Sequence, residues 1–198
     1  MFTENSGKGG GIFNYDYSNP TVNNCTITDN SAQAMACDSY LQSRPSVVTI
    51  LNCIIWNGPN WLWNNDNSTV RISYSDVQGV WPGEGNIDAD PCFDDPNKDD
   101  YHLKSQAGRW DVNEGRWTKD EVTSPCIDAG DPKSPIGFEP FPNGGIINMG
   151  AYGGTAEASK SYFGEPVCET IMAGDINGDC IVDFKDFAIM AYHWLEEH

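Results

Sequence analysis

Basic residues are scarce in this chain, which has 11 Lys and Arg against 29 Asp and Glu and a formal net charge of −18. A surface this negative repels phosphate backbones and anionic lipids, so we expect neither nucleic acid nor a membrane surface as a partner. No run of about 18 apolar residues occurs, which argues against a membrane span. The first residues have neither a basic stretch nor an apolar core, so no signal peptide is visible.

Leucine is also rare, with five residues against 15 isoleucines, whereas glycine occurs 20 times. This balance favours strands broken by turns over helices. The seven cysteines include no Cys-x-x-Cys pair and no Cys/His spacing suited to zinc. Their odd number leaves at least one free thiol, and an oxidising compartment is compatible with this count without being required by it.

A six-residue pattern recurs in the N-terminal part of the chain. Residues 22–27 align with residues 50–55 and, more weakly, with residues 72–77. The last apolar residues of these units, together with Phe2, are 25, 28 and 22 residues apart. A constant strand motif with variable spacing indicates regular coils that carry loops of different lengths.

Each unit contains a break in its apolar pattern. Apolar residues occupy positions 1, 4 and 6, and Asn24 and Asn52 lie at the break. Asparagine adopts the left-handed conformation more readily than most residues, so we expect two short strands joined at a stacked asparagine corner. Val22, Ile50 and Ile72 should then stack inside successive coils. Unrelated strands of a β-sandwich are the alternative interpretation.

Motifs further along the chain point to a known group of proteins. The coil pattern of residues 9–14 and 19–27 is followed by further motifs at residues 73–79, 87–91, 100–103, 124–130 and 148–152. Together they resemble bacterial right-handed parallel β-helix proteins of the pectate-lyase-like superfamily, including the region that closes such helices. The resemblance implies a mainly β solenoid end with an irregular closing region, and an extracellular or cell-surface location. It is specific for architecture rather than for activity.

We accordingly divide the chain into β-helix coils and closing region at 1–163, a linker at 164–172, and a calcium loop with a helix at 173–198. Phe2 matches the end of a repeat rather than its start, so we expect the chain to be either the C-terminal part of a longer helix or the product of a truncated reading frame. Residues 106–123 are interpreted as an insertion. Cys92 and Cys126 lie in neighbouring closing motifs and are candidates for a disulfide.

The sharpest chemical motif spans the twelve residues from Asp175 to Asp186. Oxygen-bearing groups occupy positions 1, 3, 5, 9 and 12, which is the spacing with which a chain wraps around one Ca²⁺ ion. A random acidic turn is the alternative. The predicted ligands are Asp175, Asn177, Asp179, the backbone carbonyl of Ile181, Asp183 and Asp186.

Apolar residues at helical spacing from Phe184 to Leu195 predict an amphipathic helix after this loop. Loop and helix resemble one half of a dockerin, a calcium-dependent module that binds cohesin domains. Asp186 at position 12 fits that pattern, but Cys180 replaces the usual glycine and only one of two repeats is present. The resemblance implies Ca²⁺ as a cofactor and a cohesin-like or other anchoring protein as a candidate partner. Cys168 is a candidate disulfide partner for Cys180.

No catalytic residue is assigned from the sequence. A lyase would need an Arg or Lys base, and the repeat region offers only Lys8, Arg44 and Arg71. A hydrolase would need two carboxylates about 5 to 9.5 Å apart. The candidates for such a pair are Asp76, Asp88, Asp90 and Asp94, while His102 and His193 are expected to be structural.

Binding is the other functional option, because aromatic faces beside amides suit sugar rings. The candidate sugar-binding residues are Trp56, Trp61, Trp63 and Trp81, unless these side chains merely cover a loop or the end of the fold. We therefore predict a non-catalytic part of a secreted or cell-surface β-helix protein that attaches or presents a polysaccharide-directed protein. A fragment of a polysaccharide lyase or glycoside hydrolase is the rival hypothesis.

Overall fold

The N-terminal half of the chain is built from short parallel strands. The computed structural model describes residues 1–6, 10–164, 174–175 and 180–194. Nine strands within the described residues form three parallel sheets of three strands each. One sheet contains β1 (Ile12–Tyr15), β4 (Met35–Asp38) and β7 (Leu62–Asn64). The others contain β2 (Thr21–Asn23), β5 (Val47–Leu51) and β8 (Thr69–Ser73), and β3 (Thr26–Thr28), β6 (Ile54–Trp56) and β9 (Asp76–Val77).

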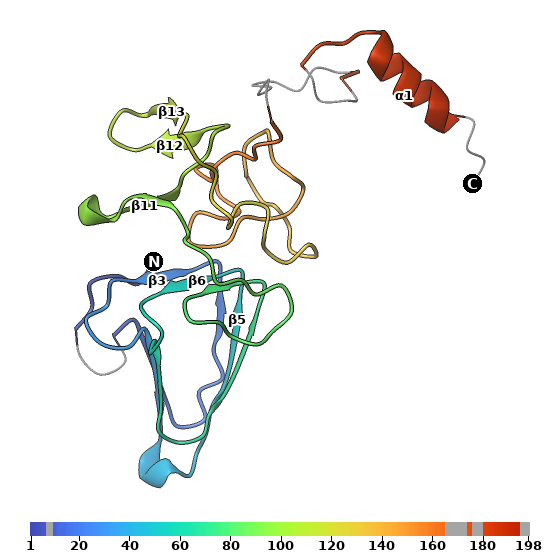
Figure 1. Cartoon of the computed structure of the whole chain (residues 1–198). Coiled ribbons are helices and arrows are strands. Elements are labelled where there is room, and N and C mark those ends of the chain that lie inside the picture. Colours follow the sequence, from blue (N-terminus) through green and yellow to red (C-terminus); the bar gives the residue numbers. More distant parts are fainter. Residues whose placement is uncertain (7–9, 165–173, 176–179, 195–198) are drawn as a thin grey trace.

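The pairing register confirms the expected stack of apolar residues. Val22 pairs with Ile50 and Ile50 with Ile72, and all three side chains are buried. Ile27 pairs in the same way with Ile55, and a parallel bridge links Phe2 to Ile27. Figure 1 shows the blue and cyan repeats following the same course side by side. The chain is therefore mainly β with parallel sheets, as the repeats predicted.

The corner between the second and third strands of each repeat is also as expected. Asn24 and Asn52 have φ angles of 47° and 54°, and the Asn52 side-chain amide donates to Asn24 Oδ1 at 3.4 Å. In the third, weaker repeat Tyr74 occupies the corner with a φ of 47°. A left-handed conformation costs an ordinary residue about 1–2 kcal/mol, so the surrounding strands must impose it on Tyr74.

The closing region, residues 80–163, follows β9 and packs against the outer side of β6. Because side chains alternate along a strand, Ile55 faces the core between the sheets, whereas Ile54 faces a second core with Leu103, Cys126 and Met149. In Figure 1 the green and orange segments of this region lie next to β3 and β6. The closing region holds the antiparallel pair β10 (Phe93–Asp95) and β11 (Asp100–Leu103), and the hairpin of β12 (Arg109–Asp111) and β13 (Arg116–Thr118). Short 3-10 helices span Tyr40–Gln42 and Pro96–Lys98.

The segment interpreted as an insertion leaves and re-enters the closing region at one point. The backbone N–H of Ser124 donates to the carbonyl of Lys104 at 2.9 Å, and β12 and β13 lie between these two residues. The segment is therefore a hairpin whose two ends are joined by a backbone hydrogen bond.

One α-helix, α1 (Phe184–Trp194), occurs in the described residues and corresponds to the predicted amphipathic helix. Its start is marked by the N–H of Asp183, which donates to Asp186 Oδ2 at 2.8 Å, an arrangement that caps a first turn. No helix in the described part of the chain is long and apolar enough to cross a membrane. The predicted linker lies outside the described residues except for Gly164.

Candidate functional site

The four candidate tryptophans do not share one surface. Trp61 is only 2% exposed and packs in the core between the sheets, where it makes an edge-to-face contact with Trp81 at a centroid distance of 5.1 Å. Trp61 is therefore a core residue, and its prediction as a sugar-binding residue is wrong, because its position in the fold removes its ring from solvent. Trp63 lies on β7 and Trp56 ends β6, and both are partly exposed.

Trp63 belongs to a row of aromatic residues on the outer face of the first sheet. Phe13 pairs with Ala36 and Ala36 with Trp63, so the three side chains form one ladder across β1, β4 and β7. The alternation along β1 places Tyr15 on the same face as Phe13, and their rings stack at 6.1 Å. Phe13 is 50% and Tyr15 45% exposed. We call Phe13, Tyr15 and Trp63 the aromatic face.

Polar groups border the aromatic face. Tyr15 pairs with Asp38, whose Oδ1 accepts a hydrogen bond from the Asn65 side-chain amide at 2.9 Å. Beyond the end of β1, Arg44 makes an ion pair with Asp16 at 3.0 Å. Exposed rings beside amide and carboxylate groups can bind the C–H faces and hydroxyls of sugars. Phe13 and Tyr15 were not predicted as binding residues, although the alternation of residues 12–15 carries a signal for an outward aromatic pair.

A pocket of about 300 Å³ lies between the third sheet and the closing region. Thr28 and Asp29 at the end of β3 and Trp56 at the end of β6 form one side of it. The other side is formed by Asp90, Cys92, Phe93, Pro96, Lys104 and Val122. The pocket therefore brings a candidate tryptophan together with charged groups of both signs.

Among the aspartates considered for hydrolysis, Asp76 is fully buried. Its carboxylate accepts hydrogen bonds from the N–H of Ala89 at 3.1 Å and from the thiol of Cys126 at 3.2 Å. Burial raises the pKa of Asp76 to about 6. A perturbed carboxyl can mark a functional site, but this one has no exposed surface through which a substrate could reach it.

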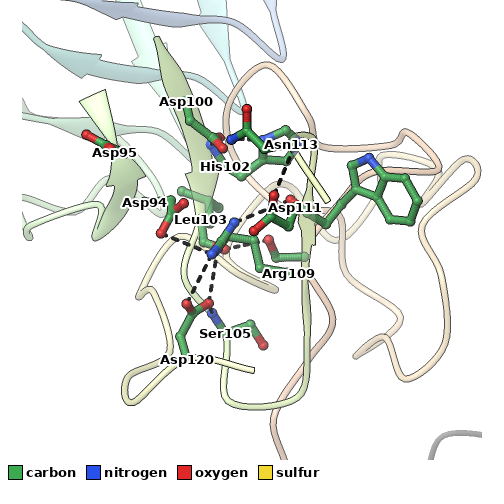
Figure 2. Close-up of polar contacts among 12 residues, drawn as sticks. Asp94, Asp95, Asp100, His102, Leu103, Ser105, Arg109, Asp111, Asn113 and Asp120 are labelled. Carbon is green, nitrogen blue, oxygen red and sulfur yellow. Dashed lines mark hydrogen bonds and ion pairs between the residues drawn. The ribbon is translucent and has the colours of Figure 1, made fainter. Parts of the chain in front are cut away.

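Asp94, another of these aspartates, belongs to an ion cluster around the buried Arg109. Figure 2 shows the Arg109 guanidinium between Asp94 and Asp120, with N–O distances of 3.0 Å and 3.3 Å. Arg109 is only 4% exposed. Burial raises the pKa of Asp94, and the positive charge of Arg109 opposes this shift. The cluster joins β12 to β10 and gives the hydrolase hypothesis no support.

His102 occupies a structural position in the closing region. Its Nδ1 lies 2.6 Å from Asp100 Oδ1, and its ring stacks on Tyr152 at a centroid distance of 3.6 Å. The histidine has no exposed surface, and Nε2 faces Glu157 at 3.6 Å. These contacts join β11 to the loops that follow it.

The predicted disulfide between Cys92 and Cys126 is wrong, because both are free thiols. Cys126 is buried against Asp76, whereas Cys92 lines the pocket and its thiol faces the Asp90 carbonyl at 3.4 Å. Cys180 is disulfide-bonded. Its predicted partner, Cys168, lies outside the described residues, so that pairing stays a prediction.

The described part of the predicted calcium loop consists of Asp175 and the residues from Cys180 onward. Asp175 Oδ2 accepts the N–H of Cys180 at 2.9 Å, and Cys180 has a φ of 65°, the conformation for which glycine is usual at this position. Asp186 is buried in the first turn of α1. Within the described residues no group of three or more His, Cys, Asp or Glu side chains could hold a metal ion. Asn177 and Asp179 lie outside these residues.

The fold and these sites define a mainly β protein of parallel sheets, with an aromatic face and a mixed pocket. Residues 61–130 match a family model described as disaggregatase related, which covers about a third of the chain. This segment includes Trp63 and six of the residues that line the pocket. Neither the curated proteins nor the solved structures contain a match to the chain.

Proposed function

We propose that the chain is the non-catalytic end of a right-handed parallel β-helix protein of the cell surface or exterior, and that it binds polysaccharide through its aromatic face. The observation that carries this proposal is the ladder of Phe13, Ala36 and Trp63 on the outer face of one parallel sheet. Strand spacing separates the two rings of this ladder by roughly 10 Å, so an extended chain of sugars can contact both. The bordering amide and carboxylate groups supply partners for the hydroxyls.

The charge of the molecule selects among polysaccharides. With a net charge of −18, the chain repels uronate-rich polymers and favours neutral ones. The rival enzyme hypothesis requires a polymer to be cut rather than held. A single assay can separate the two, because binding and depolymerisation can be followed on the same sample.

Replacing Phe13 by alanine is expected to weaken the binding of a neutral polymer, either a soluble glucan or a soluble galactan, by roughly tenfold, because an exposed aromatic platform is lost. Affinity electrophoresis of the full chain measures this change, with polygalacturonate as the acidic comparison. Phe138→Ala is the matched control, since Phe138 is 83% exposed and does not belong to β1, β4 or β7, and its backbone N–H donates to the carbonyl of Gly154. Equal effects of the two variants, or no retention of the wild type by any polymer, would contradict the proposal. Release of new chain ends would favour the enzyme.

We further propose that the loop from Asp175 to Asp186 binds one Ca²⁺ ion and that the ion orders the start of α1. The hydrogen bond from Cys180 to Asp175 and the left-handed φ of Cys180 support this proposal. Calcium would be held by carboxylate and carbonyl oxygens and would offset part of the negative charge there. A loop and helix of this kind suit attachment to a partner protein, for which a cohesin-like domain is the candidate.

Asp175→Asn is expected to weaken Ca²⁺ binding by roughly tenfold or more, because a charged oxygen ligand is lost while the acceptor for the Cys180 N–H remains. Calorimetric titration of the full chain with calcium chloride measures the affinity. Glu121→Gln removes an exposed acid outside the loop and should bind as the wild type does. Unchanged affinity in Asp175→Asn would remove the assignment.

A further inference from the structure

We propose that the pocket at Trp56 binds a single neutral sugar residue and that it is a site distinct from the aromatic face. The choice of a sugar as ligand rests on the proposed polysaccharide-directed function. The pocket itself rests on different residues, from β3, β6 and the closing region. The two proposals can therefore fail separately.

The size of the pocket indicates one sugar ring rather than a length of polymer. Its volume of about 300 Å³ lies at the lower end of the range for small-molecule sites. Trp56, Phe93 and Val122 provide apolar surface, against which the C–H face of a sugar can pack. A terminal sugar can enter such a pocket while the rest of its chain remains outside.

The carboxylate of Asp29 is oriented before any ligand binds. The hydroxyl of Tyr101 donates to Asp29 Oδ2 at 3.0 Å, and the hydroxyl of Thr28 lies 3.4 Å from the same atom. Tyr101 is only 1% exposed, so its position is set by the closing region. A preorganised acceptor binds a sugar hydroxyl at a lower entropic cost than a mobile one. Thr28 also donates to the carbonyl of Trp56 at 2.8 Å, which connects the two binding residues.

The charges that line the pocket select a neutral ligand. Asp29 and Asp90 carry two negative charges against the single positive charge of Lys104. The carboxylates accept hydrogen bonds from sugar hydroxyls, and Lys104 donates to a hydroxyl or ring oxygen. A uronate or a phosphorylated sugar would bring a further negative charge into a site that is already negative, which disfavours it.

The test is a calorimetric titration of the full chain with glucose, galactose and mannose separately, and with galacturonate as the charged analogue. At least one neutral hexose should bind with a millimolar dissociation constant, and galacturonate should bind at least roughly tenfold more weakly. Trp56→Ala should weaken hexose binding by roughly tenfold. Asp29→Asn should also weaken hexose binding by roughly tenfold. Asparagine still accepts a hydrogen bond from the Tyr101 hydroxyl, so a loss of binding in this variant cannot be attributed to misfolding, as it could be in Trp56→Ala.

Phe138→Ala is the control, because Phe138 is exposed, belongs neither to the pocket nor to the aromatic face, and should leave hexose binding unchanged when replaced. Absence of binding by all three hexoses, unchanged affinity in both pocket variants, or equal affinity for galacturonate would overturn the pocket proposal. Retention on a neutral polymer that is lost in Phe13→Ala but kept in Trp56→Ala would leave the proposed function standing without the pocket. Hexose binding without polymer retention would support the pocket and contradict the proposed function.

Discussion

Ionisation of Asp76 is expected to lower the free energy of unfolding of the wild type by about 3 kcal/mol between pH 4 and pH 7. The Asp76→Asn variant should not show this loss. Asp76 is fully buried, and burial raises its pKa from 3.8 to about 6. Below pH 3.8 the carboxyl is protonated in the folded and unfolded states alike, so it has no effect. As the pH rises, the Asp76 carboxyl ionises first in the unfolded chain, so the folded state becomes less stable relative to the unfolded state. Above pH 6 the penalty is complete, and one pKa unit corresponds to about 1.4 kcal/mol.

The measurement is the free energy of unfolding from urea titrations at pH 4, 5, 6 and 7. The quantity that tests the prediction is the difference between wild type and Asp76→Asn, because other acids contribute equally to both proteins. This difference should grow in favour of the variant as the pH rises. Asp99→Asn is the control, since Asp99 is exposed and asparagine tolerates its φ of 59°. A difference that stays constant with pH would show that Asp76 ionises normally.

The repeat architecture could be predicted because it is encoded locally. A six-residue pattern aligned Val22, Ile50 and Ile72, and asparagine at the break identified the corner. Parallel pairing of neighbouring repeats then follows from burying the same positions in each. The corner at Tyr74 shows the limit of this reasoning, because tyrosine has no local preference for a left-handed φ and only the register places it there.

The binding surfaces were harder to predict because they depend on which side of a strand a residue occupies and on contacts distant in sequence. Trp61 and Trp63 are two residues apart, yet Trp61 lies in the core and Trp63 in the outer ladder of β7, because Trp61 precedes the strand and the alternation of side chains along β7 does not extend to it. The pocket joins residues from Thr28 to Val122, and no spacing rule links them. Composition could name Trp56 as a candidate, but only the packing of the closing region surrounds it with Asp29 and Lys104.

Ile50→Ala is expected to destabilise the chain by about 2–5 kcal/mol, which is a large part of the total stability of a typical domain. Ile50 has no exposed surface and lies between Val22 and Ile72 in the inward stack. Because it has a neighbour on both sides, the cavity left by its side chain cannot be closed by movement of a single strand. Ile50→Val removes only one methyl group and should cost about 0.5–1.5 kcal/mol.

The control for this series lies on the same strand. Val47 begins β5 and is 37% exposed, so Val47→Ala should cost less than about 1 kcal/mol even though it changes the same sheet. Urea unfolding of the full-length variants gives all three values, and equal denaturant slopes would show that the unfolded states are comparable. The order expected from the stacked register is Ile50→Ala, then Ile50→Val, then Val47→Ala. If Ile50→Ala cost no more than Val47→Ala, the inward stack on which both binding surfaces are built would not exist in solution.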